Sequence, residues 1–435
     1  MNFLICILTS LISLNVFASL AYDYSPSASM YGTFGVSNFD ESDAANSHAL
    51  PALLANKKEN LFSLNLNSVL FDLESFDNIL IASNINSSQS SPLFGEHDPN
   101  PQDSYLLSIH GSFALFKSIP GKLNLSVYTP IDKLAEIQTG DPYLPEYPLY
   151  KKLERFMFEF NYAHKFDNFN ASIGALGGLQ SSGQTFVVAK DNGSPIPSSA
   201  EISQNATPSL SLNFSLYRDF EKFSAYFRFQ DEVKSKIENK LESFLAAGGG
   251  TININWQMDS LMFYDPRTFE IGSNIKFKNY KLITSIEYQD WSNFESPRLN
   301  LTNDGGILVS SDDEVNYKAH AIIIPTIALI DKNDDYTISY SISHKPSPLD
   351  LYDNKNGNTL DLDRTSLGLS LSKTIKYQKD SFNLSLGLQY HHLHKQKINK
   401  SGLREDGDAG QKIGSGGYEA QGQIYATSFG INWVI

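Results

Sequence analysis

The chain contains almost no cysteine and only one long apolar stretch. Cys6 is the single cysteine among 435 residues, which excludes a disulfide framework and thiol chemistry from everything that follows it. Beyond the N-terminus there is no apolar run of the roughly 18 residues that a membrane-spanning helix needs. Positive charge is also in deficit, and the formal net charge of −14 argues against a nucleic-acid partner, because such partners require basic surfaces.

The one apolar stretch predicts export. Residues 3–20 carry no charge, and Ser19-Leu20-Ala21 is a small-x-small cleavage site before a polar segment. This is the pattern of a secretory signal peptide, so we expect residues 1–21 to be removed, with cleavage after Ala18 or Ala21. The alternative is an uncleaved membrane anchor, since the run just reaches spanning length.

Alternation of apolar and polar residues then predicts the fold class. Phe156, Phe158 and Phe160 alternate with Glu159 and Asn161, and this period of two marks a strand with two different faces. Residues 223–230, 269–275, 282–289, 382–389 and 425–433 repeat the pattern. Aromatic residues make up 12% of the chain, which suits strands that meet lipid on one face and water on the other.

The connections between strands favour a membrane barrel over a soluble sandwich. Tight turns at residues 166–168, 218–221 and 278–280 alternate with long polar loops, as in an outer-membrane barrel whose termini share one rim. Segment 251–258 is a fifteenth candidate strand, which we place in the loop between Val233 and Arg267 or as an extension of the strand that follows. The fourteen strands predicted lie near residues 61–73, 103–117, 122–128, 155–166, 169–179, 209–217, 222–233, 267–277, 281–289, 317–330, 336–344, 365–375, 382–391 and 423–435.

The predicted class is therefore all-β, a transmembrane antiparallel barrel over residues 61–435. Residues 22–60 precede the first strand, alternate poorly and are rich in Ala, Ser and Asn. A barrel of this strand number has a lumen that is either filled or conducts water. We expect residues 22–60 to fill it as an N-terminal hatch.

Motifs in this segment resemble a known family. Residues 32–35 (Gly-Thr-Phe-Gly), 43–46 (Asp-Ala-Ala-Asn) and 50–54 (Leu-Pro-Ala-Leu-Leu) resemble the hatch of the outer-membrane long-chain fatty-acid and hydrocarbon transporters, the FadL-like family. Asn46, Pro51 and Ala52 are the motif residues, and Leu50 stands where the family's Asn-Pro-Ala signature has Asn. Further similar stretches follow in chain order at residues 127–130, 226–236, 288–294, 343–348 and 358–364.

The resemblance implies a fourteen-stranded barrel with a hatch, and passive uptake of hydrophobic molecules such as fatty acids or hydrocarbons. It also implies that substrate leaves sideways through a gap beside the third strand. That predicted strand is the shortest of the fourteen, with Gly121 and Pro130 at its ends, and proline cannot donate to a strand ladder. We expect a monomer without a cofactor, in contact with outer-membrane lipid and lipopolysaccharide.

Two loop segments are candidates for capturing a hydrophobic solute. Residues 237–247 follow a helical apolar pattern in which Leu241, Phe244 and Leu245 share one stripe. Such a helix offers an apolar groove, or alternatively packs against its neighbours like any amphipathic helix. A second apolar cluster consists of Tyr143, Leu144, Tyr147, Leu149 and Tyr150.

Charged residues on the predicted lumen face have two interpretations. Arg228 and Lys276 stand against Glu159, Glu270 and Glu287. Salt bridges among them could anchor the hatch, which we favour because buried charges are usually paired. Alternatively, Arg228 or Lys276 could bind the carboxylate of a fatty acid while apolar groups bury its tail.

Other functions remain as alternatives. A water-filled diffusion porin or an adhesion barrel predicts an open lumen with steady ion conductance. A barrel lipid hydrolase would use His110 and Ser112, which share a strand face, but no third residue orients them. His392 and His394 suggest a metal, yet an aromatic and histidine girdle at a rim explains them better. We therefore expect no catalysis and no metal site.

Overall fold

The structure is a computed structural model, and several loops fall outside the part of it that is described. The predicted signal peptide, residues 1–21, also lies outside it. Within the described residues no helix has both the length and the apolar composition to cross a membrane. The described residues are 24–82, 93–101, 103–116, 119–131, 147, 149–150, 156–178, 184–187, 190–191, 194–195, 200–206, 209–247, 250–294, 300–303, 319–333, 335–349, 360–377, 380–399, 414 and 416–435.

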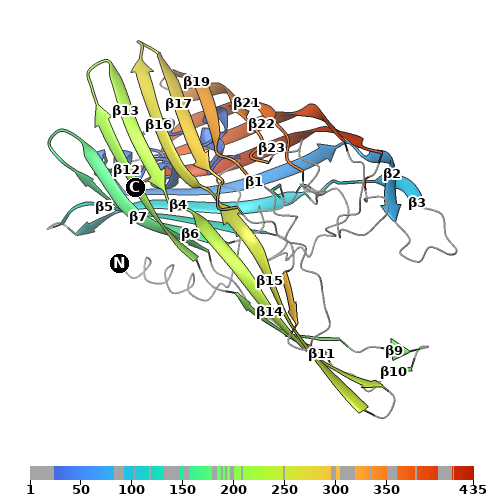
Figure 1. Cartoon of the computed structure of the whole chain (residues 1–435). Coiled ribbons are helices and arrows are strands. Elements are labelled where there is room, and N and C mark those ends of the chain that lie inside the picture. Colours follow the sequence, from blue (N-terminus) through green and yellow to red (C-terminus); the bar gives the residue numbers. More distant parts are fainter. Residues whose placement is uncertain are drawn as a thin grey trace.

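Fourteen antiparallel strands close into a barrel (Figure 1). Each corresponds to one of the fourteen predicted strands, so the fold class predicted from alternation is confirmed. In the order around the barrel they are β1 (Leu61–Leu73), β23 (Tyr418–Val434), β22 (Asp380–Ile398), β21 (Arg364–Tyr377), β20 (Tyr336–Lys345), β19 (Ile322–Lys332), β17 (Tyr280–Asp290), β16 (Arg267–Lys276), β13 (Phe223–Gln230), β12 (Ser209–Asp219), β7 (Asn170–Gly178), β6 (Met157–Lys165), β5 (Ile119–Pro130) and β4 (Ser104–Phe116).

The wall is polar inside and apolar outside. On β1, Ser63, Asn65 and Asn67 are buried, whereas Leu64 and Leu66 are 40% and 48% exposed. Large apolar side chains exposed in this way would be unfavourable in water but suit a surface that contacts lipid. Closure of β1 onto both β23 and β4 leaves no open edge, so the backbone can satisfy its own hydrogen bonds in a bilayer.

The tight turns at one rim share a common structure. In each, a phenylalanine N–H donates to the carbonyl of an aromatic residue three positions later: Phe166 to Phe169, Phe220 to Phe223, and Phe277 to Tyr280, all at 2.8 Å. In the first two turns the rings also stack, with centroids 4.8 and 4.4 Å apart. Short hydrogen-bonded turns of this kind join adjacent barrel strands directly, as predicted.

A second sheet projects from the barrel on the side of the long loops (Figure 1). Its strands are β18 (Asn300–Asn303), β15 (Gly250–Asp265), β14 (Val233–Ala247), β11 (Ala200–Ala206) and β8 (Gln184–Val187), in that order. The fifteenth candidate, residues 251–258, is part of β15. Two small ribbons, β2 (Phe76–Ala82) with β3 (Leu93–His97) and β9 (Lys190–Asp191) with β10 (Ser194–Pro195), complete the strands.

The helix predicted over residues 237–247 is wrong, because this stretch is the second half of β14. Leu241 pairs with Trp256 and Leu245 with Ile252 along a ladder that continues to Gly250. The apolar residues of this stretch fit a period of two as well as a helical period, so pairing with β15 decides between them. Strand preference depends on such cross-strand neighbours more than on local propensity.

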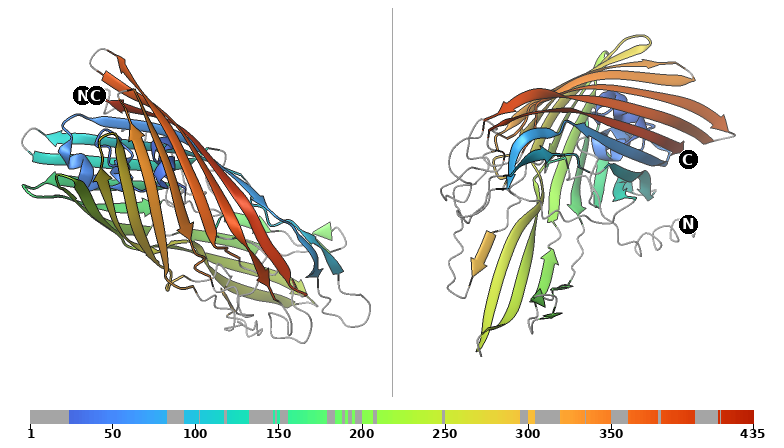
Figure 2. Two further views of the ribbon diagram at one scale, coloured as in Figure 1. Left: turned by 90° about the horizontal axis from the view of Figure 1, so that it is seen from above. Right: turned by 90° about the vertical axis from the view of Figure 1, so that its right-hand side faces the viewer.

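The N-terminal segment, Tyr24–Asn60, lies against the inner face of the barrel wall (Figure 2). It contains three short helices: η1 (Ala28–Thr33), α2 (Asn46–Ala49) and η2 (Pro51–Asn56). Gly32 shows how closely it approaches the wall, because a Cβ there would lie 2.6 Å from the carbonyl oxygen of Ser339. Only glycine permits that approach.

Candidate functional site

The polar lumen face binds the backbone of the N-terminal segment. Wall side chains donate to its carbonyl oxygens at points spread along its length, and a wall amide oxygen also accepts from one of its N–H groups. These contacts satisfy buried backbone groups that have no partner within a regular helix or sheet. They run from Ser108 to Pro26 (2.8 Å), Ser370 to Ser29 (3.0 Å), Gln389 to Tyr31 (3.0 Å), Asn432 to Ser42 (2.6 Å), and from the Ala44 N–H to Asn432 (2.9 Å).

Asn46, the first motif residue, forms hydrogen bonds within the segment. Its amide donates to the Asp40 carbonyl at 2.9 Å, and its side-chain oxygen accepts from the Ser37 hydroxyl at 2.7 Å. The side chain is fully buried. These bonds hold the loop before α2 against the helix, and they explain why an amide suits this position better than an acid or an apolar residue.

Pro51 and Ala52 dock the segment on two strands. The Asn124 amide of β5 reaches the Pro51 carbonyl at 3.4 Å, and the Ala52 N–H donates to the Ser215 hydroxyl of β12 at 3.1 Å. Pro51 stands at the start of η2, where a missing N–H costs nothing and the ring presets the helical φ. Both motif residues therefore make docking contacts with the wall.

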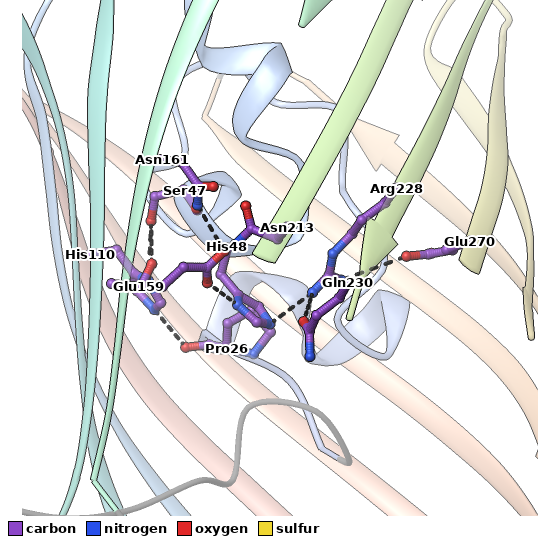
Figure 3. Close-up of polar contacts among 11 residues, drawn as sticks. Pro26, Ser47, His48, His110, Glu159, Asn161, Asn213, Arg228, Gln230 and Glu270 are labelled. Atoms are coloured by element: carbon purple, nitrogen blue, oxygen red, sulfur yellow. Dashed lines mark hydrogen bonds and ion pairs between the residues drawn. The ribbon is translucent and has the colours of Figure 1, made fainter. Parts of the chain in front are cut away.

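His48 lies at the centre of a buried polar cluster (Figure 3). Its Nδ1 is 2.6 Å from Oε2 of Glu159 on β6. The other oxygen, Oε1, accepts hydrogen bonds from the amides of Asn161 (2.8 Å) and Asn213 (2.7 Å). Asn161 also donates to the carbonyl of Ser47 at 3.0 Å. Glu159 is thus a buried carboxylate with both oxygens occupied, one of them by the N-terminal segment.

Arg228 on β13 closes the cluster from the other side. Its Nη2 lies 3.4 Å from Nε2 of His48, and its Nη1 lies 3.7 Å from Oε2 of Glu270 (Figure 3). We assign His48 the tautomer in which Nδ1–H donates to Glu159 and Nε2 accepts from Arg228. The neighbouring carboxylate alone would favour an imidazolium, but that form would place an N–H against the guanidinium.

The electrostatics agree with a neutral His48. Burial lowers the pKa of its imidazole below the usual value, Glu159 opposes this shift, and Arg228 adds to it. A neutral imidazole between a carboxylate and a guanidinium has a donor and an acceptor in the right places. The cluster therefore ties the segment to β6 and β13 without an additional charge.

The two predicted lumen cations do not come together. Lys276 is paired with Asp219 beside a tight turn and is 36% exposed, whereas Arg228 is only 11% exposed within the cluster. Of the two interpretations, the contacts of Arg228 favour anchoring over capture of a ligand carboxylate. Sequence analysis missed His48 itself, although it stands between the motif residues Asn46 and Pro51.

The predicted pair of His110 and Ser112 has a different set of contacts. His110 Nε2 lies 3.0 Å from the Pro26 carbonyl, and its Nδ1 lies 3.0 Å from the hydroxyl of Ser126 on the next strand. Ser126 in turn contacts Ser47 at 2.7 Å. His110 is completely buried, and together with Ser126 it docks the N-terminal segment, whereas the buried hydroxyl of Ser112 has no hydrogen-bond partner among the described residues.

The three neighbouring histidines of β22 are separated by strand alternation. His391 is buried and contacts Ser366 at 2.6 Å, whereas His392 and His394 are exposed on the outer face. In the described part of the chain, no three His, Cys, Asp or Glu side chains are grouped so that they could hold a metal ion.

An apolar layer lies over the docked segment at the end of the barrel where the long loops leave. We call it the outer apolar layer. It includes Leu73 of β1 and Leu393 of β22, and aromatic residues from loops, from β15 and from the start of the N-terminal segment. Among these aromatic residues are Tyr24, Tyr147, Tyr150, Tyr264, Trp291 and Phe294. Of the predicted second apolar cluster, Tyr147, Leu149 and Tyr150 belong to this layer, while Tyr143 and Leu144 lie outside the described residues.

A small cavity borders the N-terminal segment. A cavity of about 50 Å³ lies between Phe34 and Val36 of the segment and the strands from β16 to β22. Its wall includes Glu287, Lys345 and Arg364. This volume accommodates a few water molecules and is too small for a long alkyl chain.

The third strand of the barrel, β5, was predicted to be the shortest of the fourteen, and it is not. It has 12 residues, so it is not the shortest barrel strand; β13 has 8. Strand β5 pairs with β4 up to Pro130 and with β6 from Lys122 to Tyr128. Pro130 does end the strand, but along this paired stretch the wall is continuous. Gly121 lies within the strand, where a Cβ would come 2.7 Å from the Ala163 carbonyl.

The three capture candidates do not share one stripe. In the ladder of β14 with β15, Leu241 pairs with Trp256 and Leu245 with Ile252, whereas Phe244 pairs with Asn253. The period of a strand is two, so these three positions do not form the predicted helical stripe.

Comparison with known proteins bears on the fold. No protein-family model matches the chain, and no curated protein gives a significant match. Among solved structures, a FadL homologue from Pseudomonas aeruginosa is similar over 96% of this chain and 99% of its own, with a TM-score of 0.60 at 12% identity. The toluene transporters TodX of Pseudomonas putida and TbuX of Ralstonia pickettii are each similar over 95% of this chain and 99% of their own, with TM-scores of 0.50 at 12% and 10% identity. At these identities the likeness establishes the fold, and the predicted resemblance is confirmed at that level.

Proposed function

We propose that this chain is a passive transporter for hydrophobic molecules in a bacterial outer membrane, with the N-terminal segment as its hatch. The observation that carries the proposal is the arrangement inside the barrel. A polar wall binds the segment at the level of His48, and an apolar aromatic layer covers it on the loop side. Solved structures with this fold include a FadL homologue and toluene transporters.

The interior favours an apolar solute over hydrated ions. A water-filled porin keeps an open polar channel, whereas here the N-terminal segment is hydrogen-bonded to the lumen wall from Pro26 to Ala52. The outer apolar layer gives no compensation to an ion that loses its hydration. An apolar solute gains by entering that layer, because each buried methylene contributes about 0.8 kcal/mol.

We place capture of the solute on the projecting sheet. By register, Leu241 and Leu245 of β14 share a face with Ile252, Ile254 and Trp256 of β15. The opposite face carries Glu238, Lys240, Glu242 and Asp259. A sheet with one apolar face replaces the predicted helix as the landing surface.

We place the exit at the seam between β5 and β6. Release into water would cost a long alkyl chain about 0.8 kcal/mol per methylene, and sideways release into the bilayer avoids that cost. Thr129 and Pro130 extend beyond the ladder with β6, which begins at Tyr128 and Met157. Tyr128 also packs edge-on against His48, so opening of this seam and movement of the hatch would be coupled.

The test is uptake by a strain that lacks its own transporters for such solutes. Cells expressing the chain should take up a labelled long-chain fatty acid or alkane faster than cells with an empty vector. In planar bilayers the same protein should show low ion conductance. No gain in uptake together with a large steady conductance would instead identify a diffusion porin.

A further inference from the structure

Two tyrosines of the outer apolar layer form a stacked pair. The rings of Tyr147 and Tyr150 lie 5.0 Å apart and are inclined by 7°. Phe71 of β1 also stacks on Tyr150, with ring centroids 6.2 Å apart and planes inclined by 13°. Tyr147 is 0% exposed and Tyr150 is 4% exposed. The packing of this column depends on the rings, and phenylalanine would provide it equally well.

Packing explains the two rings but does not explain why each carries a hydroxyl group. Among the described residues, neither Tyr147 Oη nor Tyr150 Oη has a hydrogen-bond partner, although both are buried. Buried polar groups are nearly always paired, and an exception requires an explanation. Burial and the charge of Asp361 raise the pKa of the Tyr150 hydroxyl well above its usual range, so it remains an O–H donor. Burial has the same effect on Tyr147.

We infer that these two hydroxyls bind an oxygen atom in the polar group of a largely apolar solute. A phenol O–H group can donate to an acceptor oxygen, such as that of an alcohol or a carboxyl group. The apolar part of the solute would lie in the surrounding layer with Trp291 and Phe294. Asp361 and Arg364, the charged groups that act on Tyr150, have opposite signs. The site would therefore recognise the acceptor oxygen of the solute more than its net charge.

This inference rests on the proposed function and narrows it to a substrate class. A solute with one oxygen-bearing group would bind better than a hydrocarbon of equal length. The gain expected from one or two neutral hydrogen bonds is about ten-fold in affinity. Tyr147 and Tyr150 would be specificity-determining residues, while the apolar layer would bind both solute classes.

The test compares three probes with a terminal bromine: dodecanol, dodecanoate and dodecane. Bromine quenches tryptophan fluorescence, and Trp291 lies in the same layer. The chain has two other tryptophans, Trp256 and Trp433, so the full-length protein is studied in nanodiscs with both kept, and the part of the quenching that W291F removes is assigned to this layer. The variant Y147F/Y150F should lose about ten-fold in affinity for dodecanol, dodecanoate or both, and none for dodecane. Which oxygenated probe responds identifies the alcohol or the carboxylate as the polar group.

The controls separate this inference from the proposed function. Y425F removes an exposed hydroxyl that donates to Gln423 on the outer face, and it should change no affinity. Y147F/Y150F removes two unpaired hydroxyls, so it should melt at the same temperature as the parent or higher; Y150F alone serves if the double variant does not fold. Equal losses for all three probes, or no loss for any, would overturn the inference and leave transport intact. Failure of all probes to bind the parent would overturn the proposed function instead.

Discussion

At the scale of single residues, the barrel reverses the usual order of polarity. Serine, asparagine and the histidines His110 and His391 occupy buried inner positions of the wall, and leucine and isoleucine are exposed. The inner residues provide hydrogen bonds for a segment that has no sheet to join. The clearest example is the binding of His48 of the segment, whose imidazole lies between Glu159 and Arg228 of the wall.

The docking of the N-terminal segment should weaken as pH falls. In the docked segment the pKa of His48 is lowered, whereas a released His48 would titrate near its ordinary value of about 6.5. The released state therefore binds more protons below that pH, and docking loses stability as pH falls from about 6.5 towards the docked pKa. Above that range the effect is absent. Single-channel recordings at pH 7.5 and pH 5 should show more frequent opening at the lower pH.

His48→Gln is the matched variant for this prediction. Glutamine can still donate to Glu159 but does not titrate, so the pH dependence should disappear. Other titratable groups of the segment or in contact with it, such as Asp40 and His110, are unchanged in this variant. Equal pH dependence in the parent and in His48→Gln would assign the effect to one of them.

At the scale of elements, two features of the wall and loops depend on strand pairing. Strand β5 is paired on both sides, so a sideways exit has to open and close. The projecting sheet, built on β14 and β15, brings apolar residues from both strands to one face. Each feature gives a prediction.

A disulfide across the seam of β5 and β6 should stop uptake. Val127 pairs with Phe158, and adjacent antiparallel strands place such residues about 4.5–5.5 Å apart, within reach of a disulfide. Oxidised V127C/F158C should bind a labelled long-chain substrate yet not release it, and reductant should restore uptake. S273C/T284C, at a seam where the two hydroxyls already touch at 2.9 Å, should transport normally. Uptake by the oxidised first variant at the parental rate would rule out this exit.

Polar residues on the apolar face of the projecting sheet should weaken capture. L241N/L245N places two amides on the face shared with Trp256 and should raise the half-saturating substrate concentration several-fold, because full burial of a leucine contributes about 1.5–3 kcal/mol. K240N/E242Q alters the opposite face to a similar degree and should leave uptake unchanged. Similar effects of both variants would mean that the sheet contributes stability and not a landing surface.

At the scale of the whole molecule, the N-terminal segment and the barrel are complementary. The wall presents polar groups along the height of the lumen, and the segment uses them from Pro26 to Ala52. Without the segment, these groups would line an open polar channel. The barrel itself is closed by pairing of β1 with β23 and does not need the segment for closure.

Deletion of residues 27–48 should therefore leave a folded but open barrel. Single-channel conductance should rise well above that of the parent, because water and ions enter the vacated lumen. Heat-modifiable mobility on a gel checks that the barrel still forms. Unchanged conductance in a folded deletion variant would show that the segment does not close the channel.

The sequence by itself determined the barrel and its strands. A strand in a lipid-facing wall must alternate, and the period of two is a local property that can be counted from Leu61 to the C-terminus. Turn residues such as Asp167 and Asn279 set the short connections in the same local way. Even the inward direction of Glu159, Arg228 and His110 followed from alternation.

Only the tertiary structure decided what those side chains contact. Closure of the wall brings β4, β5, β6, β12 and β13 to one segment, so the partners of His48 come from distant parts of the chain. The strand at Leu241 also depends on tertiary structure. Its local sequence pattern fits a helix, and pairing with Trp256 selects the strand instead. The unpaired hydroxyls of Tyr147 and Tyr150 became visible only once their surroundings were known, since a lack of partners is a property of the packed interior.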